Sequence, residues 1–252
     1  MKNMLRLEFT KLKRQKSFYI CLAIMLGLAF LNTLTAKAVL STIPELLGGM
    51  YGSGIQSLMT GMSDSSFTIV ASIFVALFVC QDYSQQTVKN IYARGYSRIS
   101  VYISKMIATF VAATVMFVVV EAAAFGFGSM FFGVGEVENF RFLGIIGAQY
   151  VVMMANMALA FAVSAILRKN GGAIPIIIVA PIVVTILLGL ADALIKSETL
   201  SLADYYINSF LNSLMSLNVT NERMIECIIG ALIYIPVLLV GGMFINKRVE
   251  NK

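Results

Sequence analysis

The chain has 252 residues, of which 59% are hydrophobic and only 13% are charged, and its mean hydropathy is +0.85. Soluble domains contain about 45–50% apolar residues, so this composition excludes a soluble globular protein and indicates a membrane protein. The net charge is +6, but the cations flank apolar segments, which is typical of membrane topology and gives no reason to expect a nucleic-acid partner.

The sequence contains no histidine, which removes most metal sites and most Ser-His or Cys-His nucleophiles. The three cysteines, Cys21, Cys80 and Cys227, lie inside apolar segments without C-x-x-C spacing, so they indicate small buried side chains. An intramembrane enzyme would need an H-E-x-x-H motif or paired carboxylates within a span, and neither pattern occurs. We therefore expect no metal, no cofactor bound by this chain and no catalytic residue.

Residues 1–16 predict an amphipathic helix. Cations cluster on one side, and the other side carries apolar residues at helical spacing: Met1, Met4, Leu5, Phe9 and Leu12. Such a helix lies in the membrane interface, with its apolar face toward lipid and its cations toward anionic headgroups. The alternative is a signal peptide cleaved near Ala36-Lys37-Ala38, but 16 residues are long for the basic segment of a signal.

Six apolar segments approach the ~20 helical residues that cross a bilayer. We expect them at about residues 18–36, 58 or 66 to 80, 102–124 with a glycine-rich continuation to 134, 143–167, 172–194 and 225–245. The predicted fold is an all-α polytopic membrane protein with six transmembrane helices in a single domain, residues 1–252. Fifteen of the nineteen Lys and Arg residues fall on one side, which predicts cytoplasmic N- and C-termini.

The connection between the second and third spans, residues 81–105, reads QDYSQQTVKNIYARGYSRISVYISK. Val88, Ile91 and Tyr92 form one apolar stripe on a predicted short helix from about residue 84 to 93. Gly95 suits the left-handed residue after a helix, and Ser97 suits the N-cap of the next one. From this pattern alone, the short helix either docks into a soluble partner or lies on lipid.

This segment resembles the cytoplasmic connection of ABC-2-type transporter permeases. The matching positions are Asp82-Tyr83, Thr87-Val88-Lys89-Asn90, Gly95-Tyr96-Ser97-Arg98 and Lys105; the family usually has glycine where this chain has Gln86. The resemblance implies a coupling helix that seats in an ATP-binding subunit. The residues that it implies for coupling are Gln85, Thr87, Val88, Lys89, Asn90, Ile91, Tyr92, Arg94, Gly95 and Arg98.

The resemblance also implies the partners. The chain has no G-x-x-x-x-G-K-[ST] motif, so a separate P-loop subunit would bind ATP and Mg²⁺. Six spans are half of the usual permease, which implies a second half, identical or homologous. Small members of this type often export amphipathic peptides, antibiotics or drugs across a bacterial plasma membrane, and peptide export with self-immunity is the expected function. The alternative is an ion-driven secondary transporter or channel.

Three residues inside spans are candidates for a substrate path or gate. Glu121 is a carboxylate expected about 24 Å above Lys105, at ~1.5 Å per residue, and it either serves transport or is hydrogen-bonded within the bundle. Pro175 and Pro181 can bend the fifth span, or simply fix its packing. Residues 191–224 predict an extracytoplasmic helix with Tyr206, Phe210, Leu214 and Leu217 on one face, lying on the outer leaflet or re-entering it.

Overall fold

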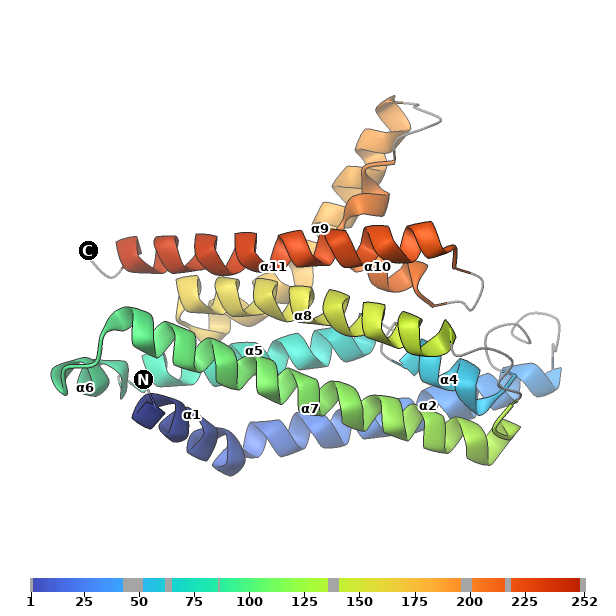
Figure 1. Cartoon of the computed structure of the whole chain (residues 1–252), viewed down its shortest axis with the longest axis horizontal. Helices are drawn as coiled ribbons and strands as arrows, with labels where there is room; N and C mark the ends of the chain where they lie inside the picture. Colours follow the sequence, from blue (N-terminus) through green and yellow to red (C-terminus); the bar gives the residue numbers. More distant parts are fainter. Residues whose placement is uncertain are drawn as a thin grey trace.

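The computed structural model describes residues 2–42, 52–61, 65–85, 87–135, 141–195, 201–215 and 219–249 (Figure 1). Within these ranges every regular element is a helix. Six of the described helices are long and apolar enough to span a membrane. They are α2 (Lys16–Thr42), α5 (Ser65–Ser84), α7 (Arg98–Phe132), α8 (Arg141–Leu167), α9 (Asn170–Ile195) and α11 (Asn221–Val249). The prediction of an all-α fold with six spans is confirmed.

Shorter helices lie at the two ends of the bundle. They are α1 (Lys2–Arg14), α4 (Gly54–Gly61), α6 (Thr87–Ala93), the 3-10 helix η1 (Ala203–Tyr205) and α10 (Ile207–Ser213). Figure 1 shows α1, α6 and both chain termini at one end, which we call the terminal end, and α4 at the opposite end. Both termini therefore lie at the same end, as an even number of spans requires. The assignment of that end to the cytoplasm stays a prediction.

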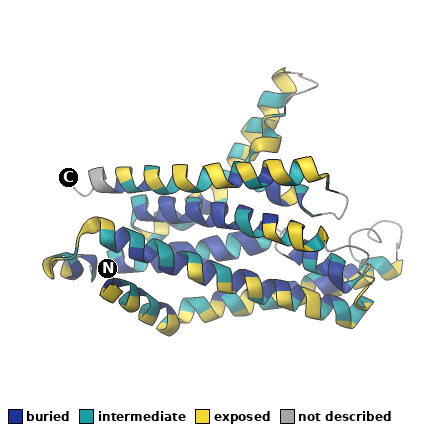
Figure 2. Ribbon diagram, in the orientation of Figure 1, coloured by how far each residue is buried: buried dark blue, intermediate teal, exposed yellow. Residues whose placement is uncertain are grey.

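The core is centred on α8 and α5, which are the most buried of the six spans (Figure 2). Its largest fully buried side chains are aromatic or flexible, among them Phe67, Phe74, Met116, Phe161, Met153 and Met157. Small residues between these large side chains, such as Ala71, Ala108 and Ala160, let neighbouring helices approach each other closely. This alternation of large and small residues fixes which helix faces pack together.

Helix α4 packs closely against α7 through small residues. A Cβ added at Gly128 of α7 would lie 2.4 Å from Ser57 Cβ of α4, and one added at Gly61 of α4 would lie 3.0 Å from Ala124 Cβ. In the glycine-rich continuation of the third span, Gly126 and Gly128 lie within α7, and the left-handed backbone comes at Gly133 and Gly135, after the helix has ended.

We expect Gly128→Ala to lower the free energy of unfolding by about 1–3 kcal/mol, because its methyl group would push α4 away from α7. Gly126→Ala is a matched control on the same helix, where nothing lies within 4 Å of the added Cβ. The thermal unfolding temperature of the two purified variants provides the comparison. Equal stability of the two variants would contradict the close α4–α7 packing.

The predicted helix within residues 191–224 is present as α10 (Ile207–Ser213), and its apolar face is buried by the protein. Phe210 and Leu214 are buried against α8 and α11, and Leu217 lies outside the described residues. Gln149 of α8 fixes both short helices of this end, since its Nε2 donates to Met59 O of α4 at 2.7 Å and to Leu214 O at 2.9 Å. Helix α10 is therefore packed into the helix bundle.

Helices α9 and α11 are the least buried of the six spans. Figure 1 shows that α9 is tilted away from its neighbours and that its far end extends beyond them. Only Ala173 and Ile177 of α9 are buried, and a row of large apolar side chains is exposed: Ile176, Val179, Ile182, Val183, Ile186, Leu187, Leu190 and Leu194. This surface is apolar enough to meet lipid or another membrane helix.

Candidate functional site

Helix α6 ends where its sequence predicts, but it begins at Thr87 rather than at about residue 84. Gly95 has φ +84°, the left-handed conformation that glycine adopts without strain, and its N–H donates to Tyr92 O at 2.9 Å. Ser97 then caps α7, because its Oγ accepts the N–H of Ser100 at 3.2 Å. The unit of helix, glycine and helix expected for residues 84–105 is confirmed, although Ser84 ends α5 and Thr87 begins α6.

The apolar stripe of α6 faces the protein. Val88 and Ile91 are only 5% and 7% exposed, and Ile91 packs with Met4 of α1 and Val101 of α7. Tyr92 is partly buried against the same group. The stripe therefore holds α6 to α1 and α7, and it is not the surface that a partner would reach.

The opposite face of α6 is exposed. It consists of Asn90, Ala93 and Arg94, and Gln85, Gly95 and Arg98 are exposed beside it. Arg98 also lies 5.8 Å from the centre of the Tyr92 ring, a cation–π contact. Thr87 is half-buried, and the side chain of Lys89 lies outside the described residues. The candidates named for coupling thus divide into an inner set that holds the helix and an outer set that a partner can contact.

A cluster of four charged residues ties α1 to α5 and α7. Lys105 of α7 is 2% exposed and forms ion pairs with Asp82 of α5 and, at 3.5 Å, with Glu8 of α1. Lys11 of α1 donates to both carboxylate oxygens of Asp82 at 3.0 Å and lies 3.4 Å from Glu8. Two cations thus balance two carboxylates, which is what buried charges require. The family motif had singled out Asp82 and Lys105, and the structure pairs them.

Glu8 and Lys11 were missed from the sequence, and two residues of the side expected to face lipid, Met4 and Leu12, are instead buried by the protein. Met4, Glu8 and Leu12 lie on one face at a spacing of four residues, and all three are buried by the protein. The sequence did contain a signal for this contact, because the Glu8 carboxylate lies between Met4 and Leu12 on the apolar face of α1. Because such a group is costly to place in lipid, it indicates a face that meets a cation of the same protein.

A cavity of about 330 Å³ lies among α5, α8, α9 and α10, toward the end opposite α6. Its aliphatic wall comes largely from α9, and its polar groups are neutral: Ser65, Thr68, Ser72, Asn156, Thr185, Asn208 and Asn212. No charged side chain is found among the described residues that line it. Thr68 is 8% exposed, and its Oγ1 has no hydrogen-bond partner within the described part of the chain. Such a hydroxyl is a ready partner for a polar group of a ligand.

A protein-family model described as "ABC-2 family transporter protein" matches residues 4–192. The chain belongs to the ABC-2 transporter family. The match begins in α1 and ends in α9, so it includes the charged cluster, α6 and most of the cavity wall. A search of curated proteins found no match, and a search of solved structures also found none. Together with the six spans, the family identifies the chain as the membrane subunit of an ABC transporter.

The ABC-2 subunit places the candidate path residues in three different surroundings. Glu121 of α7 is 5% exposed and lies beside α4, where a Cβ on Gly61 would be 3.3 Å from its Oε2. Pro181 lines the cavity, whereas Pro175 lies on the exposed side of α9. The structure therefore brings Pro181, but neither Glu121 nor Pro175, to the wall of this cavity.

Proposed function

We propose that this ABC-2 permease works as the membrane subunit of an ATP-driven exporter, and that a separate P-loop subunit binds ATP and Mg²⁺. The terminal end would face the cytoplasm of a bacterial cell, as the distribution of Lys and Arg predicts. The observation that carries the proposal is the position of α6. It is a short helix fixed on its inner face and exposed on its outer face, at the end that carries most of the cations.

Movement of α6 would reach the spans through two contacts. The first is the apolar group of Met4, Ile91 and Val101, which joins α6 to α1 and α7. The second is the cluster of buried charges, which joins α1 to α5 and α7. Closure of the ATP-binding subunits on α6 would displace α1 and the adjacent ends of α5 and α7 together. ATP binding would in this way favour one arrangement of the spans over another.

The neutral cavity supports an amphipathic or hydrophobic substrate, such as a peptide or an antibiotic. Its aliphatic wall would take apolar side chains, and its hydroxyl and amide groups would hydrogen-bond polar ones without requiring charge. Through Pro181, α9 forms part of this wall and also carries the exposed apolar row. A second permease half, identical or homologous, would cover that row and complete the path. Peptide export with self-immunity follows as the proposed role.

The test is to purify the tagged chain gently from its native membrane and to identify the proteins that accompany it by mass spectrometry. We expect a P-loop ATPase in roughly stoichiometric amount. We also expect the complex to hydrolyse ATP, and amphipathic peptides to stimulate that hydrolysis. Absence of an ATPase from a preparation in which the permease remains folded and monodisperse would contradict the proposal. An ATPase that ignores every peptide but responds to another class of compound would change only the substrate.

A further inference from the structure

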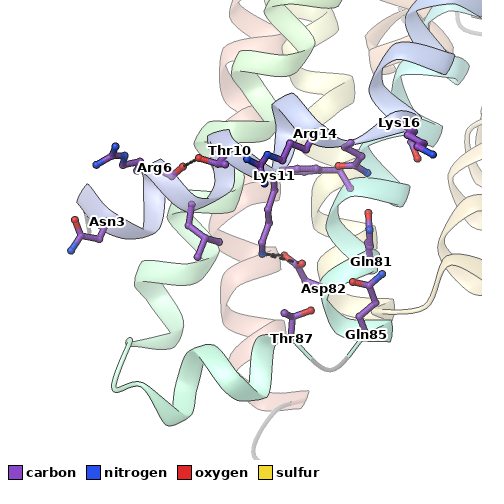
Figure 3. Close-up of a pocket in the computed structure, with 14 residues that line it drawn as sticks. Asn3, Arg6, Thr10, Lys11, Arg14, Lys16, Gln81, Asp82, Gln85 and Thr87 are labelled. Carbon is purple, nitrogen blue, oxygen red and sulfur yellow. Dashed lines mark hydrogen bonds and ion pairs between the residues drawn. The ribbon is translucent and has the colours of Figure 1, made fainter.

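A large groove lies beside the charged cluster at the terminal end (Figure 3). Its volume is about 800 Å³, and α1, the first residues of α2, the last turn of α5 and the start of α6 form its walls. Figure 3 shows Lys11 reaching across the groove from α1 to Asp82 of α5. Neither the family match nor the proposed transport function assigns a ligand to this groove.

The walls of the groove are strongly basic. Four cations line it, Arg6, Lys11, Arg14 and Lys16, against a single carboxylate, Asp82. Lys11 and Lys105 already neutralise Asp82. Arg6, Arg14 and Lys16 are exposed, and none of them takes part in the ion pairs found among the described residues. Three cations therefore remain available to an anion in the groove.

The groove also contains hydrogen-bond donors without partners. Gln15 Nε2 and Thr87 Oγ1 are buried at its wall and have no hydrogen-bond partner in the described part of the chain. Buried donors in a protein are normally satisfied, because leaving one unsatisfied costs about 1–3 kcal/mol. A ligand with several acceptor oxygens would satisfy both groups while it neutralises the cations.

The groove lies level with the ends of two membrane spans, and this position favours a lipid over a soluble anion as its ligand. Lys16 and Ser17 begin one membrane span, and Gln81 and Asp82 lie in the last turn of another, so the groove opens where the bilayer headgroups lie. Ile20 and Ile24 follow Ser17 on the same face of α2, and they are 57% and 48% exposed. An acyl chain can run along this apolar face while its phosphate stays among the cations.

We propose that this groove binds the headgroup of an anionic phospholipid, with the acyl chains along α2. The phosphate would accept from Arg14, and Arg6 and Lys16 would attract the headgroup from the two sides of the groove (Figure 3). The remaining headgroup oxygens would accept from Gln15 and Thr87. The bound lipid would fill the space between α1 and the end of α5, and would thereby hold α1 against the bundle.

The experiment compares two double variants of the full-length chain. R6Q/R14Q removes two cations that line the groove, and K2Q/K13Q removes two exposed cations of the same helix that do not line it. The detergent-purified proteins are titrated with phosphatidylglycerol or phosphatidylcholine, and native mass spectrometry counts the lipids retained. We expect wild type and K2Q/K13Q to retain phosphatidylglycerol with equal affinity and in preference to phosphatidylcholine. We expect R6Q/R14Q to bind it about thirtyfold more weakly.

Three results would overturn the proposal. Equal weakening of both double variants would mean that the whole charged surface, rather than the groove, attracts lipid. Displacement of the lipid by inorganic phosphate would mean that the groove holds a free anion. Unchanged lipid retention by R6Q/R14Q, together with loss of a co-purifying ATPase, would mean that the cations meet an acidic protein surface. The first two outcomes leave the proposed transport function untouched, whereas the third would add these cations to the surface that contacts the ATPase.

Discussion

Replacing Lys105 by methionine is expected to lower the free energy of unfolding by about 3–5 kcal/mol. Lys105 is buried and is shared by Glu8 and Asp82, whose side chains are 0% and 8% exposed. Without it, two buried carboxylates would share Lys11 alone, and that side chain is 30% exposed. Thermal or denaturant unfolding of the purified variant measures the loss.

Lys169→Met is the matched control, because Lys169 is exposed at the connection between α8 and α9. It should leave stability close to wild type. Adding Asp82→Asn to Lys105→Met should cost much less than the sum of the two single changes, because the groups in contact are removed together. Additive losses would show that Lys105 and Asp82 do not interact in the folded protein.

Arg94→Glu is expected to reduce the amount of ATPase that co-purifies with the permease at least about tenfold, with no change in the stability of the permease. Arg94 is exposed on the outer face of α6, where it would meet a carboxylate of the partner. Two like charges facing each other in an interface cost several kcal/mol, and each 1.4 kcal/mol is a factor of ten in affinity. Quantitative mass spectrometry of the purified complex gives the ratio.

Lys37→Glu controls for the change of net charge, since Lys37 lies near the end of α2 that is opposite α6 (Figure 1). It should leave the ATPase bound. Acidic substitutions of Val88 or Ile91 would be a poor test, because both side chains are buried and the variants would detach α6 from α1 and α7. Wild-type levels of ATPase with Arg94→Glu would mean that the partner does not dock on the outer face of α6.

The membrane spans could be predicted from the sequence because a bilayer imposes a simple local rule. A helix of about 20 apolar residues crosses it, and hydropathy along the chain reveals such helices directly. The caps of α6 and α7 were also predictable, since Gly95 and Ser97 act through their own backbone or through groups three residues away. Features that depend only on neighbouring residues can therefore be predicted from the sequence.

Features that depend on contacts between distant residues were not predictable in this way. Helix α4 is only eight residues long and contains two glycines, so nothing in its composition marks it as a helix that packs on α7. The stripe of α6 was visible, but an apolar face indicates burial without saying what covers it. The pairing of Glu8 with Lys105 joins residues 97 positions apart, and no pattern in the sequence connects them.

The buried cluster also constrains how the chain assembles during synthesis. Glu8 is synthesised before its cation on α7, which follows 97 residues later. At about 5–20 residues per second, Lys105 follows Glu8 after about 5–20 seconds. During that interval Glu8 has Lys11 of its own helix beside it, but it lacks the buried ion pair with Lys105. Helix α1 can therefore complete its buried contacts only after α7, the third span, has been made.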